Sequence, residues 1–315
     1  MKQRTRKVWP NTVEVALGDA LEWGIQRWVV WTGRETRISE APWLEGPIGE
    51  RRIGPDFYEA YAREEALELV EGEPETGLLT DFSVLSGGGF EAEVVRPEIR
   101  RFYERTALFG LDVRPEWSGP LRYSARTLIY LVSRNIQQLN LPTSPVAAGA
   151  GMSSELIGLR NPITNQVPYC GWLRRSLATG AVIYAGLYTT CELPGRQGRF
   201  VKVVFPLPNG SATVVLRPEN RPDGSFALVS AGDGFGDAGY YRVHRGPDDT
   251  LQAKYVPIKE EIHVFVDRAG TLRTNHTLAL WRARFLTLHY EISRLSTALA
   301  MTEAAYLEAR RWRDL

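Results

Sequence analysis

The chain has 315 residues, of which 43% are hydrophobic and 24% charged, and this length is enough for one large globular domain or two moderate ones. Its 38 basic residues are balanced by 37 acidic ones, which leaves a net charge of +1. This balance argues against the basic surface that binding to a nucleic acid backbone requires, so we expect no nucleic acid partner.

Cysteine usage and the apolar stretches predict a cytoplasmic protein. Cys170 and Cys191 are too few for a disulfide framework in a chain of this size, so we expect both thiols to be reduced. The longest apolar stretch, residues 13–31, carries three carboxylates and one arginine, which would be costly in a bilayer. It also lacks the cleavage site of a signal peptide. Only peripheral contact with a membrane stays open.

The first 89 residues predict a helical subdomain rich in tryptophan. Asn11-Thr-Val-Glu14 has the spacing of a capping box and is followed by apolar residues near the helical repeat. A second helix is expected over 56–70. Ser86-Gly-Gly-Gly89 has little to pack and predicts a turn or linker, so we place the boundary there, with 90–315 as the second domain. The tryptophans pack in the core, line a ligand cavity, or form a membrane-facing or docking surface; they are Trp9, Trp23, Trp28, Trp31 and Trp43.

Three further helices are predicted at intervals along the second domain. Pro97 stands at a favoured first-turn position and opens a short helix. Residues 121–139 have apolar side chains at helical spacing, and Pro142 ends that segment. A last helix is expected over 296–312. The segment 152–155 is expected to be a loop at the border of the sheet.

From Trp172 onward the apolar residues alternate, which predicts antiparallel strands. Asn209-Gly210 is a strong signal for a hairpin turn. The expected strands are 181–190, 200–205, 211–216, 226–230, 240–244, 261–267, 271–277 and 278–292. This order predicts an α+β fold rather than βαβ units: a long antiparallel β-meander or partial barrel covered by helices. A helix-grip-like or lipocalin-like arrangement of this kind can enclose an apolar cavity.

No cofactor and no metal site is predicted. Residues 234–239 match G-x-G-x-x-G, but the segment that follows alternates like a strand, where a dinucleotide site needs a helix. We therefore expect a glycine-rich turn. The nearby aspartates match no calcium-loop spacing, and no two histidines have the spacing of a helical zinc site.

All four histidines lie in the last quarter of the chain: His244, His263, His276 and His289. Glu261 and His263 share one face of a predicted strand, and the turn at 268–270 can bring His276 near Glu260 or Glu261. A His–carboxylate pair of this kind can act in acid–base catalysis, with Glu261, His263 and His276 as the candidates. The alternative is that they are hydrogen-bonded structural histidines of a half-buried strand. Both interpretations stay open.

Candidate ligand contacts lie on two predicted strands. Arg282 and Arg284 stand among leucines on one face, where they either bind the anionic head of an amphipathic ligand or pair with nearby glutamates. Tyr184 and Tyr188 are four residues apart and therefore share one face, as the wall of a hydroxyl-lined pocket requires. His289 is a further candidate.

Several segments resemble an uncharacterised bacterial family, a domain of which follows the membrane segments of YndJ-type proteins. The segments are FYERTALFGLDVRPEWSG, SRNIQQLNLPTSP, GMSSEL, KVVFPLPNGSATVVLRP and TLRTNHTLALWRARFLTLHYEI. The resemblance covers residues 97–292. It brings no catalytic residues with it, and it favours lipid or membrane-linked chemistry.

These observations support three functional hypotheses. The first is a cytoplasmic protein that binds an apolar or amphipathic small molecule, such as a lipid, isoprenoid or polyketide, in a cavity between sheet and helices. The second is an enzyme on the same scaffold, a cyclase, isomerase or hydrolase with a Glu/His acid–base pair. The third is an interaction module that docks through its tryptophan-rich segment, which requires an exposed apolar surface there. The oligomeric state is open in all three.

Overall fold

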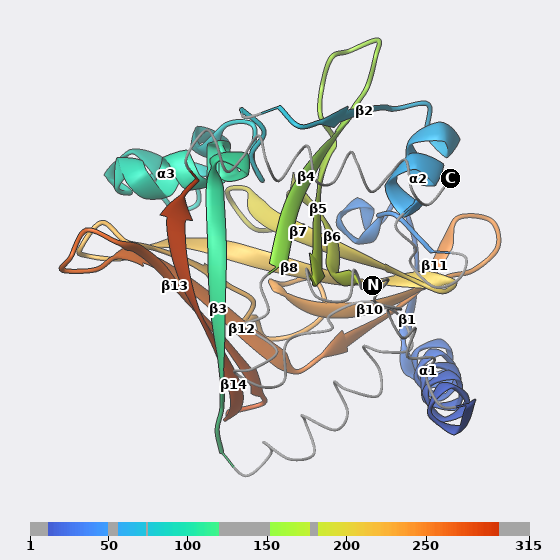
Figure 1. Cartoon of the computed structure of the whole chain (residues 1–315). Coiled ribbons are helices and arrows are strands. Elements are labelled where there is room, and N and C mark those ends of the chain that lie inside the picture. The colour runs from blue at the N-terminus through green and yellow to red at the C-terminus, as the bar shows by residue number, and fades with distance from the viewer. Residues whose placement is uncertain (1–11, 50–55, 74, 120–151, 177–181, 296–315) are drawn as a thin grey trace, which may run out of the picture.

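The strands of the described chain form one antiparallel sheet, as the computed structural model shows (Figure 1). The structure describes residues 12–49, 56–73, 75–119, 152–176 and 182–295. The 14 strands are β1 (Arg34–Arg37), β2 (Glu68–Glu71), β3 (Phe109–Trp117), β4 (Met152–Arg160), β5 (Tyr169–Ser176), β6 (Val182–Cys191), β7 (Phe200–Leu207), β8 (Gly210–Asn220), β9 (Phe226–Val229), β10 (Gly239–Arg245), β11 (Thr250–Val256), β12 (Ile258–Val266), β13 (Leu272–Leu280) and β14 (Ala283–Arg294). The sheet-rich character expected from the sequence is confirmed.

The sheet forks at β8. Its main path runs β2-β4-β5-β6-β7-β8-β9-β12-β13-β14-β3. The first half of β8 pairs with β10, which continues the sheet through β11 to β1, and the second half pairs with β9. β7 and β8 are joined by the predicted hairpin, in which Asn209 has a φ of 58°. The long β8 therefore belongs to two ribbons that diverge from each other.

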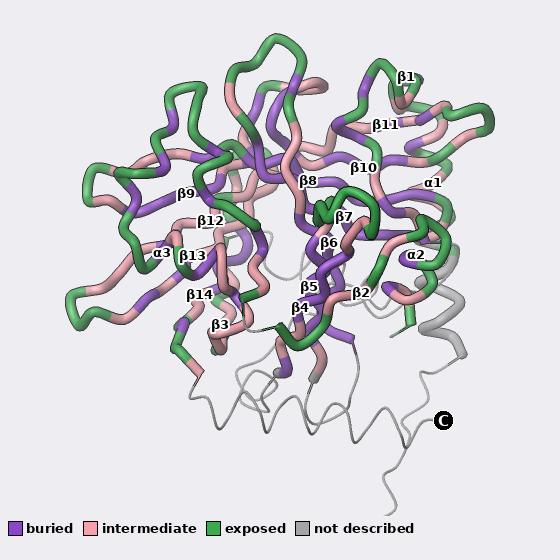
Figure 2. Tube along the Cα trace, turned by 90° about the horizontal axis from the view of Figure 1, so that it is seen from above, coloured by how far each residue is buried: buried purple, intermediate pink, exposed green. Residues whose placement is uncertain are grey.

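The main path curves until its two sides face each other, as the arms on either side of β8 show in Figure 2. The edge strand β3 comes into contact with β4 from the opposite side of the sheet. We call the concave side of this curve the inner face and the convex side the outer face. One large apolar cluster includes inner residues of both arms, among them Trp172, Val203, Leu216 and Val264, so the largest apolar cluster of the described residues lies on the inner face. Smaller clusters pack elsewhere on the sheet.

An aromatic group fills one part of the inner face. The connection that carries η2 (Phe82–Leu85), η3 (Ala92–Val94) and α3 (Pro97–Glu104) packs there. Phe82 contacts Phe226 with ring centroids 5.1 Å apart, and Tyr103 contacts the same ring at 5.3 Å. Burying several aromatic rings at once stabilises the fold strongly, because each removes a large apolar area from water.

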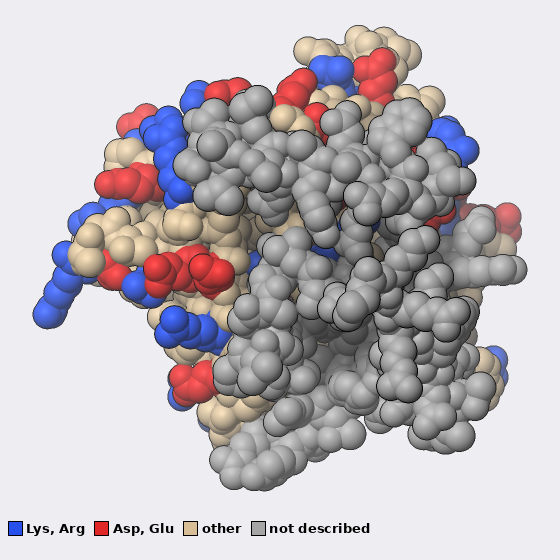
Figure 3. Space-filling model, viewed as in Figure 1, with Lys and Arg blue, Asp and Glu red and all other residues tan. Residues whose placement is uncertain are grey.

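The other described helices pack at the flanks of the sheet. α2 (Phe57–Glu64) lies on the outer face, where Tyr58 reaches the backbone carbonyls of Trp172 and Gly186. α1 (Thr12–Thr32) packs against β10 and β11. Two further 3-10 helices are η1 (Pro42–Leu44) and η4 (Thr106–Leu108). Basic and acidic side chains are interspersed over the described surface on the face that Figure 3 shows.

Three expected elements differ in the structure. The helix expected over 56–70 ends at Glu64, because Ala66 has a left-handed φ of 52° and the next residues alternate as β2. Residues 152–155, expected as a loop, begin β4. The single strand expected over 278–292 is instead the end of β13, a turn at Trp281 and Arg282, and β14.

Other expectations are confirmed or lie outside the described residues. The glycine-rich segment before β10 is a turn, in which Gly234 and Gly236 have positive φ. The helices expected over 121–139 and 296–312 lie outside the described residues, and the cover they were expected to provide stays a prediction. The domain boundary at 89 also stays a prediction; strands from both sides of it pair in one sheet.

Candidate functional site

A group of ionisable and hydroxyl-bearing side chains interrupts the apolar inner face. It lies between the aromatic group and a second apolar cluster, and its members come from both arms of the sheet. We call this group the inner polar layer; it consists of Arg174 (β5), Tyr184 and Tyr188 (β6), Glu260 (β12), His276 (β13) and Tyr290 (β14). Polar groups in apolar surroundings are normally hydrogen-bonded, so a group of the layer without a partner is unusual.

Arg174 is the most buried cation of this layer, with 6% of its surface exposed. β5 alternates, which places Arg174 two residues from Trp172 on the inner side. Its guanidinium lies over the ring of Trp172 at 5.3 Å and over that of Tyr290 at 5.6 Å. Its Nε and one terminal nitrogen, Nη2, are buried and make no hydrogen bond to any residue of the described chain. A buried guanidinium with unpaired N–H groups is costly, so this edge of Arg174 is a position where a hydrogen-bond acceptor would be stabilising.

The three tyrosines present neutral hydroxyl groups beside Arg174. The hydroxyls of Tyr184 and Tyr188 are hydrogen-bonded at 2.8 Å, so the predicted sharing of one strand face is confirmed. Burial raises the pKa of both hydroxyls well above the usual value for tyrosine. Burial also raises the pKa of Tyr290, although the charge of Arg174 acts in the opposite direction. The layer therefore offers hydroxyls that can both donate and accept hydrogen bonds.

Glu260 and His276 form the acid–base pair of the layer. Nε2 of His276 lies 3.1 Å from a carboxylate oxygen of Glu260, and the two side chains are 20% and 12% exposed. The hairpin between β12 and β13 sets this contact, because His276 stands opposite Ile262, two residues from Glu260 on the same face. The predicted approach of His276 to Glu260 is confirmed.

A second apolar cluster adjoins the inner polar layer. Its buried members are Val113, Phe285, Leu286 and Leu288, and Tyr290 packs against them as well as against the main core. The cluster continues through the half-buried Trp117, Leu278 and Leu280. The inner face therefore carries a cation and several hydroxyl groups directly beside an apolar surface.

The remaining predicted acid–base residues lie on the outer face. Glu261 accepts a hydrogen bond from Arg221 at 2.8 Å in an exposed ion pair. Nε2 of His263 lies 2.8 Å from the hydroxyl of Ser225, and burial, assisted by Arg221, lowers the pKa of His263. The hydroxyl of Ser225 donates a hydrogen bond to Asp223 at 2.6 Å. In a catalytic triad the carboxylate orients the histidine, whereas here it binds the serine.

His289 also points to the outer face, where it contacts Asn275 at 2.8 Å and Glu116 at 3.0 Å. Arg282 and Arg284 are exposed at the β13–β14 hairpin and have no ion pair to a residue that the structure describes. The turn at Trp281 and a bulge next to Phe285 shift the alternation, which removes Arg284 from the face of the leucines. The structure therefore keeps these three residues apart from Tyr184 and Tyr188.

Sequence reasoning did not select Arg174, Glu260 or Tyr290 as site residues. Glu260 was considered only as a partner for other groups. Arg174 had a usable signal, because Cys170, Trp172 and Arg174 alternate with small and apolar neighbours. An arginine at an inward position of such a strand is unusual, since arginine is rarely fully buried without a partner.

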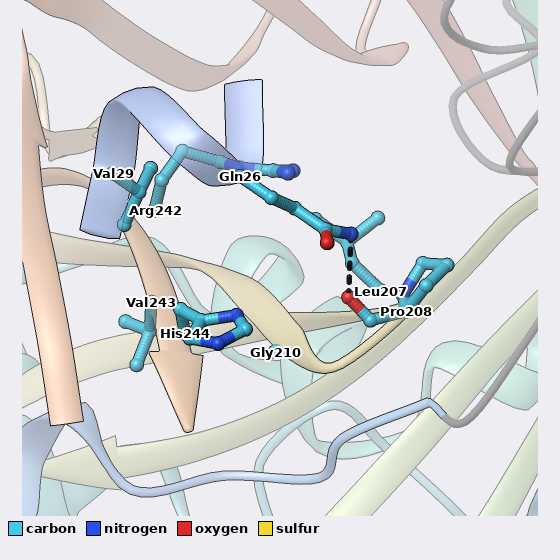
Figure 4. A pocket seen from close by; sticks show the side chains of 8 residues that line it. All are labelled: Gln26, Val29, Leu207, Pro208, Gly210, Arg242, Val243 and His244. Carbon is cyan, nitrogen blue, oxygen red and sulfur yellow. Dashed lines mark hydrogen bonds between the residues drawn. The ribbon is translucent and has the colours of Figure 1, made fainter. Parts of the chain in front are cut away.

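The two cysteines and a small pocket beside α1 lie outside the inner polar layer. Burial raises the pKa of Cys170 to about 12 and that of Cys191 to about 11, so both thiols stay protonated and unreactive at neutral pH. A pocket between α1 and β10 is lined by Gln26, Arg242 and His244, among others, and has room for about one water molecule (Figure 4). No three potential metal ligands gather in the parts of the chain that the structure describes.

Comparison with known proteins gives one informative similarity. The chain is 26% identical over 257 residues to the uncharacterised membrane protein YndJ of Bacillus subtilis (strain 168), so it is a weak homologue of that protein. The match covers 81% of this chain but only 44% of the relative, so the chain spans less than half of that protein's length. No protein-family model and no solved structure matches the chain. None of the described helices has both the length and the apolar character needed to cross a membrane.

Proposed function

We propose that the protein binds an amphipathic small molecule whose anionic head group pairs with Arg174. The observation that carries this proposal is the unpaired edge of a guanidinium that is only 6% exposed. Nε and Nη2 lie on the same edge of the guanidinium plane, and this edge can donate two parallel hydrogen bonds to a carboxylate or phosphate. Such a ligand would supply the charge and the acceptors that Arg174 lacks.

The surroundings of Arg174 favour a head group with more than one acceptor. Tyr184, Tyr188 and Tyr290 are neutral, so they can donate to further oxygens without repelling an anion. The guanidinium lies over the rings of Trp172 and Tyr290, and these two contacts orient it before a ligand arrives. This orientation reduces the entropy lost on binding.

The apolar portion of the ligand is assigned to the second apolar cluster. Tyr290 packs against this cluster and also lies under the Arg174 guanidinium, so a head group at Arg174 would place a tail toward the half-buried Trp117, Leu278 and Leu280. A cavity between the sheet and the predicted helices, as expected from the sequence, remains part of the proposal. The similarity to a protein named as a membrane protein is in keeping with a lipid or another membrane-derived molecule.

Native mass spectrometry, followed by organic extraction, tests this proposal. We expect the purified protein to carry an anionic amphiphile, and a delipidated sample to gain thermal stability on addition of fatty acids or lysophospholipids. Arg174→Met should lose this binding while it keeps or raises the melting temperature, because it replaces an incompletely paired buried charge by an apolar side chain. Arg160→Met, at an exposed ion pair with Glu68, is the matched control and should bind normally.

Two results would overturn the proposal. One is a wild-type protein with no bound amphiphile and no thermal shift across the lipid panel. The other is an Arg174→Met variant that is folded and binds the same amphiphile with unchanged affinity.

A second candidate function is acid–base catalysis by the Glu260–His276 pair, as in a cyclase, isomerase or hydrolase. The observation that favours it is the 3.1 Å contact at the inner polar layer, beside the hydroxyl groups of the tyrosines. It predicts that Glu260→Gln abolishes turnover of the bound molecule with little change in melting temperature. Glu261→Gln, on the outer face, is the matched control and should retain full turnover. Equal turnover by both variants would reject this function.

A further inference from the structure

Over residues 22–32, the second half of α1, the distribution of polar and aromatic side chains differs from that of an ordinary surface helix. The side chains that face the sheet include Glu22, which is 6% exposed, and Gln26. The side chains that face away include Trp23 and Trp31, which are 66% and 72% exposed. A helix on the surface of a globular protein normally presents its apolar stripe to the core and its polar residues to water. The outward tryptophans therefore need an explanation outside the fold of the described chain.

Polar contacts hold this orientation of α1. Glu22 accepts a hydrogen bond from Arg242 at 2.6 Å in a nearly buried ion pair, and Gln26 donates to the carbonyl of Pro208 at 3.0 Å. Val29, which is 2% exposed, supplies the apolar contact on the same side. Turning the helix to bury its tryptophans would break the Glu22–Arg242 pair, which is costly for buried charges. The exposure of the rings is thus built into the packing.

Cations are interleaved with the exposed rings. The Arg27 guanidinium lies 4.7 Å from the ring centre of Trp31 and 5.9 Å from that of Trp23, so the three side chains form one stripe along α1. Beside them, Lys254 lies 5.4 Å from the ring centre of Trp28 and donates to the carbonyl of Thr32. We call Trp23, Arg27, Trp28, Trp31 and Lys254 the tryptophan ridge. None of its members is acidic.

We propose that the tryptophan ridge docks on the interface of a bilayer that contains anionic phospholipids. Tryptophan rings favour the headgroup level of a membrane, where one edge is apolar and the other is wet. Arg27 and Lys254 are placed to meet lipid phosphates, and basic side chains are attracted to anionic leaflets. α1 lies at the edge of the described body (Figure 1).

The composition of the ridge favours a lipid surface over a specific protein partner. Protein interfaces use about one hydrogen bond per 100–200 Å² to fix their register. The ridge carries aromatic rings and cations, while the exposed carboxylate of Glu35, which follows α1, accepts a hydrogen bond from Gln252. Rings and cations without directional acceptors suit a fluid surface of phosphates. This inference is independent of ligand binding at Arg174.

Vesicle co-sedimentation of the full chain tests the inference. We expect binding to vesicles of phosphatidylcholine with phosphatidylglycerol, weaker binding to phosphatidylcholine alone, and a blue shift of tryptophan fluorescence on binding. The double variant Trp23→Ser/Trp31→Ser should lose about tenfold or more in affinity, because it removes two interfacial anchors. Arg27→Glu should lose about fivefold or more, and the loss should shrink at high salt.

Two control variants change exposed side chains that lie outside the tryptophan ridge. Ile163→Ser removes a side chain that is 92% exposed in the β4–β5 loop, and Arg268→Glu reverses an exposed charge in the β12–β13 turn; both should bind as the wild type does. Arg174→Met should also bind vesicles normally, which separates docking from ligand binding. Wild-type protein that stays in solution with both kinds of vesicle would overturn the proposal. So would a dimer seen by light scattering that the double tryptophan variant dissociates, since a second copy would then cover the ridge.

Discussion

The two faces of the ribbon formed by β12, β13 and β14 carry the same kinds of residue in different surroundings. On the inner face, Glu260 meets His276 at 3.1 Å, where both side chains are largely buried. On the outer face, the adjacent Glu261 pairs with Arg221, and His289 pairs with Glu116 while both remain exposed. A shift of one residue along a strand therefore decides whether a carboxylate or a histidine contributes to an enclosed site or to the solvated surface.

This difference has a physical consequence for what each pair can do. Water and salt screen an exposed ion pair, so its net contribution is typically between zero and about 1 kcal/mol. The same contact in a low-dielectric setting interacts more strongly, and an unpaired group there is costly. The local field is thus stronger for the pair on the inner face, and substitutions on the two faces should differ most clearly in stability.

The largest contrast is expected for phenylalanine. Phe226 is fully buried on the inner side against Phe82 and Tyr103, so Phe226→Ala should destabilise the fold by about 3–5 kcal/mol. Phe265 is half-buried on the outer face, where it stacks on His263, so Phe265→Ala should cost much less. Urea unfolding of both variants measures the difference. Equal losses would show that the outer face carries as much of the core as the inner face.

A smaller contrast is expected between the two adjacent glutamates. Glu260→Ala leaves the largely buried His276 without its acceptor and should cost about 1–3 kcal/mol. Glu261→Ala removes an exposed ion pair with Arg221 and should change stability by a few tenths of a kcal/mol at most. The comparison is best made by chemical denaturation at pH 7, at low and at high salt. If Glu261→Ala proved the more damaging, the assignment of faces would be wrong.

Within the inner polar layer, the hydrogen bond between Tyr184 and Tyr188 should contribute about 0.5–1.5 kcal/mol. Either Phe substitution removes one hydroxyl, and the double variant removes the pair. A double-mutant cycle should therefore show coupling, with the double variant costing less than the two single losses combined. Strict additivity would mean that the two hydroxyls do not depend on each other.

The hairpins and strands with strong local signals could be predicted from the sequence. Elements in which a turn or bulge changes the alternation could not. Asn209-Gly210 correctly predicted the β7–β8 hairpin because a left-handed residue at such a turn favours asparagine or glycine. Strand β11, with the polar alternation TLQAKYV, was missed because its partners β1 and β10 supply the context. Glu260 was considered only as a partner for other groups, because sequence alternation alone cannot say which face of a strand will be enclosed.

Trp281 is the clearest case of a local signal that opposed the structure. Tryptophan is bulky, favours strands and gives no turn signal, yet Trp281 occupies the turn between β13 and β14 with a φ of 54°. A non-glycine residue with this φ is strained, and the least so when it is asparagine. The prediction of a continuous strand over 278–292 is wrong at this residue, and the positions predicted for Arg282 and Arg284 are therefore wrong as well.

The smallest expected effect tests this interpretation of the turn. Trp281→Asn should stabilise the protein by about 0.4–1 kcal/mol, because asparagine tolerates the left-handed conformation and the side chain of Trp281 is 65% exposed, with little packing to lose. Urea unfolding with an unchanged dependence on denaturant concentration is the appropriate measurement. Arg282→Asn, one residue later in the same turn, is the control and should show no gain, since Arg282 is not left-handed. A loss of stability in Trp281→Asn would instead mean that the indole makes contacts that outweigh the backbone strain, and the turn would then be held by its side chain rather than by the register of β13 and β14.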